Sequence, residues 1–119
     1  MARYKITKHD GAYVYTAPLH KECKCYRLHD PFDVDDGQLV NGITHFLPQG
    51  GGTDWGANPA ESIYFILKGT MLFKGEDGEE TILNEGDSVH IAAGSPKMVT
   101  NIGVGVAEMH VILLPPKKD

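Results

Sequence analysis

Apolar residues in this chain occur in short runs that Gly, Asp, Asn or Pro interrupts every few residues. No window of about 11 or more residues repeats apolar positions at helical spacing without such an interruption, whereas short runs typical of strands are frequent. The pattern therefore predicts about nine or ten strands. They include the segments 12–17, 23–29, 39–47, 62–68, 70–74, 81–83, 88–92, 97–101 and 106–114.

The connections between these segments are turns and one long loop, 48–61, which contains the glycine-rich stretch QGGGTDWG. The strand that follows, 62–68, is apolar at both odd and even positions, which predicts a strand covered on both faces. Because no connection can hold a crossover helix, the strands must pair antiparallel and bury one face of each sheet. The fold class is therefore all-β, a small sandwich or jelly-roll barrel with an interior cavity open at one end.

Composition limits the class of protein further. The 119 residues fit one domain, and a hydrophobic content of 41% is that of a globular protein. The net charge is −5 and no Lys/Arg block precedes the last few residues, so nucleic acid and an anionic membrane are poor candidates as partners. No apolar run resembles a signal peptide or a membrane span, and we expect a cytoplasmic protein. Residues 115–119 are predicted to form a strand stop and a charged tail. Cys23 and Cys25, two apart on one strand, are poorly placed to bridge each other.

The segment 86–101, GDSVHIAAGSPKMVTN, is predicted to form two strands joined by a Gly-Ser-Pro turn. It resembles the second motif of the cupins, in which Gly, Pro, Gly, His and Asn follow one another at fixed spacing. The two Gly residues and Asn101 are in register with that motif, whereas Ala92 stands in place of the Pro and Lys97 in place of the His.

A second segment, NPAESIYFILKG, resembles the first cupin motif, in which two His separated by one residue precede a Glu and a Gly. Gly69 occupies the position of that Gly. Gly56 and Asn58 stand where the two His would be, and Ser62 stands where the Glu would be.

The resemblance covers about residues 40–114 and implies that the chain, 1–119, is a single cupin domain, a double-stranded β-helix with N-terminal strands within 12–29. In cupins the two motifs bring three His and one Glu onto one divalent metal. All four ligand types are replaced here, and the ammonium of Lys97 would repel a cation. We therefore expect no metal cofactor at these positions.

A metal site built from other residues is the weaker alternative. His45, Glu108 and His110 lie on predicted strands, and the two His with either Glu108 or Glu61 could supply ligands from three strands. His90 shares its parity with Ser88 and is expected to face away from the interior.

Alternation along the strands predicts which side chains line the interior. In the register of the family, Tyr64 and Lys97 point inward. The predicted ligand pocket consists of Asn58, Ser62, Tyr64, Lys97 and Asn101, with Trp55 on a rim that can fold over the cavity. A buried ammonium needs a partner. Lys97 either pairs with Glu61 or Glu108, reaches the barrel mouth, or binds an anionic ligand.

Several functions are compatible with this pocket. The first is a binding or sensing domain for a small-molecule ligand, an organic acid whose carboxylate Lys97 holds. The second is an isomerase, lyase or epimerase that acts without a metal, with Lys97, Tyr64 or His110 as general acid or base, or with Lys97 as a Schiff-base nucleophile. A metal enzyme with displaced ligands and a purely structural dimer stay open. The resemblance also implies a homodimer, to which the apolar run 63–67 would contribute.

Overall fold

The protein is described by a computed structural model that covers residues 3–116. Within them the chain forms eleven strands, two short 3₁₀ turns, η1 (His9–Gly11) and η2 (Pro31–Asp33), and no α-helix. The strands are β1 (Tyr13–Tyr15), β2 (His20–Lys21), β3 (Cys23–His29), β4 (Val40–Phe46), β5 (Gly52–Thr53), β6 (Glu61–Lys68), β7 (Met71–Gly75), β8 (Glu80–Leu83), β9 (Ser88–Ile91), β10 (Lys97–Asn101) and β11 (Ala107–Leu114). The predicted all-β fold class is confirmed.

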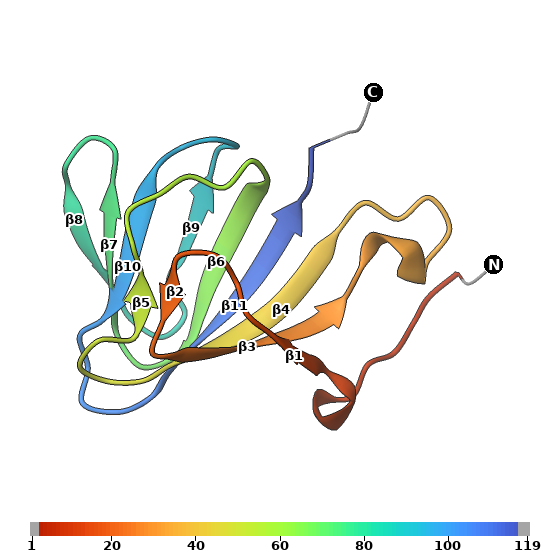
Figure 1. Ribbon diagram of the computed structural model, residues 1–119, viewed down its shortest axis with the longest axis horizontal. Coiled ribbons are helices and arrows are strands. Elements are labelled where there is room, and N and C mark those ends of the chain that lie inside the picture. The colour runs from red at the N-terminus through yellow and green to blue at the C-terminus, as the bar shows by residue number, and fades with distance from the viewer. Residues whose placement is uncertain (1–2, 117–119) are drawn as a thin grey trace.

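The strands form two antiparallel sheets (Figure 1). One sheet has six strands in the order β1-β3-β4-β11-β6-β9, and the other has five in the order β2-β5-β10-β7-β8. Strands distant in sequence are neighbours in both: β11 lies between β4 and β6, and β10 lies between β5 and β7. This crossing of the chain between sheets is the jelly-roll arrangement that the sequence predicts.

Alternating side chains fill the space between the two sheets. β6 buries every second residue from Ser62 to Ile66, and β10 does the same from Lys97 to Asn101. The predicted interior register is therefore confirmed. The hydrophobic core consists of Phe46, Tyr64, Ile66, Met71, Leu83, Ile91, Val99, Ala107 and Met109.

The hydrophobic pattern does not reveal two of the strands. β2 and β5 have two residues each and pair with each other, with His20 opposite Thr53. β5 lies inside the segment 48–61 that the pattern predicts to be a loop. Segments this short carry no periodicity, and β5 is ordered by pairing with β10.

The expectation that β6 is covered on both faces is wrong for a single chain. Ile63, Phe65 and Leu67 point away from the core and are 37%, 39% and 42% exposed. They alternate with the buried residues of the same strand, so the outer side of the six-stranded sheet carries an apolar patch. We call these three residues the outer apolar face.

No helix in residues 3–116 has the length and apolar character needed to cross a bilayer. Cys23 and Cys25 are free thiols, as expected from their spacing. Pro115 and Pro116 follow β11 outside any strand, and the charged tail predicted at 117–119 lies outside the described residues.

Candidate ligand-binding site

A cavity of about 220 Å³ opens where β2, β5 and the loop after β5 meet β6 and β10. Its polar lining is His20, Thr53, Asp54, Asn58, Tyr64 and Lys97. Its apolar lining is Ala17, Pro18, Leu19, Gly56, Ala57 and Pro59. Pockets for drug-sized ligands measure about 300–1,000 Å³, so this cavity suits a smaller molecule.

Lys97 is the first residue of β10, at the end of the strand that borders the cavity. Its N–H donates to the carbonyl of Gly56 (2.9 Å), and its carbonyl accepts from the N–H of Gly56 (3.1 Å), a bridge that joins the loop to the strand. Alternation along β10 turns the side chain inward, and the residue is only 8% exposed. A charge covered to this degree needs a compensating partner.

The ammonium of Lys97 has no carboxylate partner among residues 3–116. The two acids predicted as its partners lie elsewhere. Glu61 Oε2 is 2.6 Å from Nε2 of His90, and Glu108 Oε1 is 3.8 Å from Nε2 of His45. The hypothesis of an internal ion pair with either acid is therefore wrong, because both carboxylates face the outer side of the sheet.

Two neutral side chains with hydrogen-bond donors, Tyr64 and Asn58, line the same cavity as this ammonium. The Nζ of Lys97 is 5.7 Å from the ring centre of Tyr64, within cation–π range. Burial raises the pKa of Tyr64 to about 12, so its hydroxyl keeps its proton at neutral pH. Asn58 Oδ1 accepts from the N–H of Ala60 (2.8 Å), which leaves Nδ2 as a donor. Burial also lowers the pKa of Lys97. A cation together with neutral hydrogen-bond donors favours the binding of an anion.

His20 is a cavity residue that lies outside both motifs. Its ring stacks on Phe46, with ring centres 6.1 Å apart, and its Nδ1 is 2.8 Å from the carbonyl of Pro18. Burial lowers the pKa of His20, the hydrogen bond to Pro18 opposes this, and the positive charge of Lys97 lowers the pKa further. No sequence signal marks His20, because only the pairing of β2 with β5 carries it to the barrel.

Three residues predicted for the pocket do not line this cavity. Ser62 is buried in the core, where its hydroxyl donates to the carbonyl of Ala60 (3.2 Å). Asn101 donates to the carbonyl of Phe46 (3.0 Å), and its other side-chain hydrogen bonds hold the turn after β10. Trp55 is 48% exposed and borders a separate surface hollow.

The residues of the alternative metal site lie on the outer side of the six-stranded sheet. His45 and Glu108 are opposite each other in the register of β4 and β11, and Nε2 of His110 lies 3.0 Å from Nδ2 of Asn41. Burial lowers the pKa of His110. Residues 3–116 contain no group of three or more His, Cys, Asp or Glu side chains placed to hold a metal ion. His90 is exposed on the same side, as predicted.

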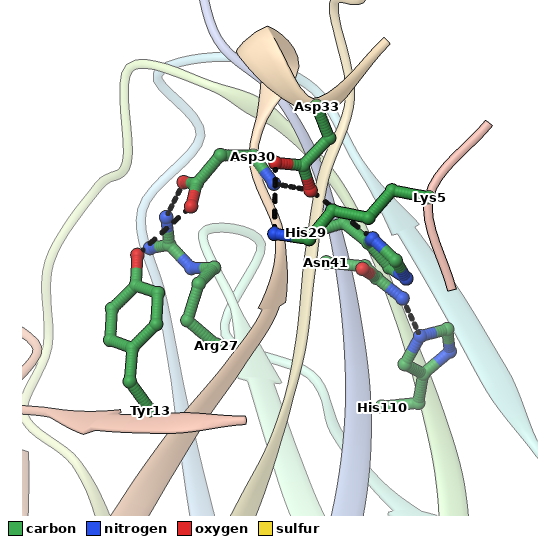
Figure 2. Close-up of polar contacts among 8 residues, drawn as sticks. All are labelled: Lys5, Tyr13, Arg27, His29, Asp30, Asp33, Asn41 and His110. Atoms are coloured by element: carbon green, nitrogen blue, oxygen red, sulfur yellow. Dashed lines mark hydrogen bonds and ion pairs between the residues drawn. The ribbon is translucent and has the colours of Figure 1, made fainter. Parts of the chain in front are cut away.

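A larger groove of about 500 Å³ lies between the N-terminal segment and the turn around η2. Two of the carboxylates that line it, those of the half-buried Asp30 and Asp33, are already paired within the chain (Figure 2). Asp33 lies 3.4 Å from Lys5 and 3.2 Å from His29, and Asp30 lies 2.8 Å from Arg27. These contacts hold the turn together, whereas the charge of Lys97 has no partner within residues 3–116. The barrel cavity is therefore the candidate site.

The sequence pattern of the family described as "Cupin domain" matches residues 42–113, more than half of the chain. The chain belongs to the cupin family. The match begins within β4 and ends within β11, so both strands that carry Tyr64 and Lys97 are inside it, whereas His20 is outside. A beta-D-galactosidase of Mycobacterium tuberculosis is 34% identical to this cupin over 101 residues, which cover 82% of each chain.

Solved structures share the fold of this cupin. The polyketide cyclase RemF from Streptomyces resistomycificus has a TM-score of 0.80 at 18% identity, over 98% of this chain and 82% of its own. A predicted oxalate decarboxylase from Thermotoga maritima has a TM-score of 0.77 at 13% identity, over 94% of this chain and 100% of its own. At such identities the likeness establishes the fold alone.

The cupin metal-ligand positions of this chain do not fit a divalent metal ion. Gly56 offers no donor, and a Cβ added to it would clash with Cδ1 of Leu19, which fills the space where a ligand side chain would begin. Asn58 and Ser62 offer only neutral oxygens, which are weaker ligands than imidazole or carboxylate, and both side chains are hydrogen-bonded to the backbone of Ala60. Lys97 presents an ammonium, which repels a cation.

Proposed function

We propose that the barrel cavity binds a small carboxylate and that the ammonium of Lys97 holds it. The observation that carries this proposal is the buried side chain of Lys97, which has no acid beside it among residues 3–116. A charge-assisted hydrogen bond contributes about 1.5–3 kcal/mol. Tyr64 and Asn58 supply further donors, and the cavity volume of about 220 Å³ supports a ligand of few atoms.

The test is calorimetric titration at pH 7 with pyruvate, oxalate and acetate, and with acetamide as the uncharged control. We expect the carboxylates to bind and acetamide not to bind. Lys97→Met should weaken carboxylate binding at least tenfold, the equivalent of about 1.4 kcal/mol. Lys68→Met removes an exposed lysine of β6 and should leave binding unchanged. Equal affinity in wild type and Lys97→Met contradicts the proposal.

The mycobacterial relative favours a second candidate, hydrolysis of a β-galactoside. Most glycosidases use two carboxyl groups that flank the scissile bond. The cavity is lined by one carboxylate, Asp54, whose side chain is 60% exposed and lies 3.1 Å from Lys21. A hydrolase built on this cavity would use His20 or Tyr64 in place of the second carboxyl group.

Release of nitrophenol from a nitrophenyl β-galactoside tests this candidate. If the cavity is a glycosidase site, Asp54→Asn should reduce the rate by about 100-fold or more, because one member of the acid–base pair is lost. The melting temperature should change little, because the side chain is exposed. Absence of nitrophenol release by the wild-type protein would reject the second candidate and leave the first untouched.

A further inference from the structure

The segment that carries His20 is held in a strained backbone conformation. Leu19 and Glu22, on either side of β2, have φ angles of 63° and 48°, which non-glycine residues rarely adopt. The carbonyl of Leu19 accepts from the N–H of Asp54 (2.8 Å), and the carbonyl of Glu22 accepts from the N–H of Leu47 (2.9 Å). Strain of this kind persists only where the surrounding structure enforces it, and it is common at functional sites.

The hydrogen bond at Nδ1 decides the tautomer of His20. The carbonyl of Pro18 can only accept, so Nδ1 carries the proton, and Nε2 of the neutral ring keeps a free lone pair. Nε2 has no hydrogen-bond partner in the part of the chain that the structure describes. Stacking on Phe46 fixes the plane of the ring. The result is a fixed ring with one unprotonated nitrogen, on a residue that lines the cavity together with Lys97.

Of the charged and titratable groups that line the cavity with His20, Lys97 favours the neutral form of the imidazole. Lys97 from β10 is a cation, and Tyr64 from β6 keeps its proton because burial raises its pKa to about 12. Asp54 follows β5, but its exposed carboxylate pairs with Lys21. Together with burial, the charge of Lys97 keeps the pKa of His20 below 6.5. His20 can therefore accept a proton at neutral pH.

We infer that His20 is a general base that removes a proton from the carbon beside the oxo group of a small 2-oxo acid held by Lys97. The inference rests on the proposed function, since Lys97 must first bind the carboxylate. The C3–H bond breaks and its proton bonds to Nε2. The electron pair forms the C2=C3 double bond, and the carbonyl pair moves to the oxygen as an enolate. Return of a proton to C3 restores the substrate, so no oxidant or further reactant is needed.

A 2-oxo acid is the class that this chemistry selects. The carbon next to a lone carboxylate is a very weak acid, because deprotonation would place a second negative charge beside the first. An adjacent oxo group accepts that charge as an enolate, and the ammonium of Lys97 stabilises it. The hydroxyl of Tyr64, which stays protonated, is the neutral donor for the enolate oxygen.

The experiment measures loss of the methyl protons of pyruvate in D₂O by proton NMR at a pD of about 7.5. We expect wild-type protein to catalyse the exchange, and His20→Gln to slow it at least about 100-fold while calorimetric pyruvate affinity stays within threefold. Lys97→Met should lose both binding and exchange. His90→Gln, an exposed histidine on the outer side, should behave as wild type.

The pH profile gives a second measurement that needs no variant. The wild-type exchange rate should fall as the pH is lowered through the pKa of His20, which lies below 6.5. Exchange that survives in His20→Gln, or pyruvate binding without exchange in the wild type, overturns the role of His20 and leaves the carboxylate site standing. Failure of the wild type to bind any carboxylate overturns the proposed function itself.

Discussion

Replacing Lys97 by Met is expected to stabilise the ligand-free protein. The residue is 8% exposed, and its ammonium has no acidic partner in residues 3–116. Met has a similar unbranched stem, so it fills the same space without a buried charge. Leaving a buried polar group without a partner costs about 1–3 kcal/mol. The lost cation–π contact with Tyr64 offsets about 0.5–1 kcal/mol of the gain.

The free energy of unfolding at pH 7 should therefore rise by up to about 2.5 kcal/mol in Lys97→Met. For a domain of this size the melting temperature should rise by up to roughly 12 °C. The assay is urea and thermal denaturation followed by circular dichroism in a buffer free of carboxylates and phosphate. The exposed-site control, Lys68→Met, should stay within about 0.5 kcal/mol of wild type.

The advantage of Lys97→Met should shrink as the pH rises toward 10.5. Burial lowers the pKa of Lys97 in the folded protein, so the unfolded chain binds this proton more tightly. Wild-type stability then increases with pH between the lowered pKa and the ordinary value of 10.5. A variant less stable than wild type by 1 kcal/mol or more would refute the reasoning, because it would mean that Lys97 has a stabilising ionic partner.

The remaining predictions concern the site, the core and the outer surface. Asn101→Ala should lower the free energy of unfolding by about 2–4 kcal/mol in urea denaturation, since a 3% exposed side chain loses three hydrogen bonds; a loss below 1 kcal/mol would contradict its structural role. Gly56→Ala should cost about 1 kcal/mol because the new Cβ displaces Leu19, and a double-mutant cycle with Leu19→Ala should remove most of that cost; simple additivity would argue against the contact. His20→Gln should flatten the dependence of melting temperature on pH between about 5 and 7. The wild type loses stability as the pH falls below 6.5, where the unfolded chain takes up a proton that folded His20 resists; parallel curves would argue against a neutral His20. The outer apolar face should pair two chains in solution, as the expected homodimer requires, and Phe65→Glu should yield monomers in analytical ultracentrifugation; a monomeric wild type would end this prediction.

The strand pattern alone determined the fold class and most strand positions. The segments 23–29 and 97–101 coincide with β3 and β10, because residues with strong turn preferences bound them. Gly94, in the turn before β10, has a φ of 79°, a conformation that glycine adopts without strain. Alternation, in the register that the resemblance to cupins implies, then placed Tyr64 and Lys97 inside the barrel, and the replaced motif residues showed that the usual metal ligands are missing.

Tertiary structure decided everything that depends on contacts between distant segments. Only the fold shows that Glu61 and Glu108 pair with histidines on the outer side, so that Lys97 has no acidic partner in the part of the chain that the structure describes. Only the pairing of β2 with β5 brings His20 to the cavity. A strand of two residues is too short to show the alternation from which a strand is predicted. The hydrophobic pattern of a strand indicates which face of the sheet a side chain occupies. The side chains that it contacts on that face belong to other strands, and the pattern does not contain the register of those strands.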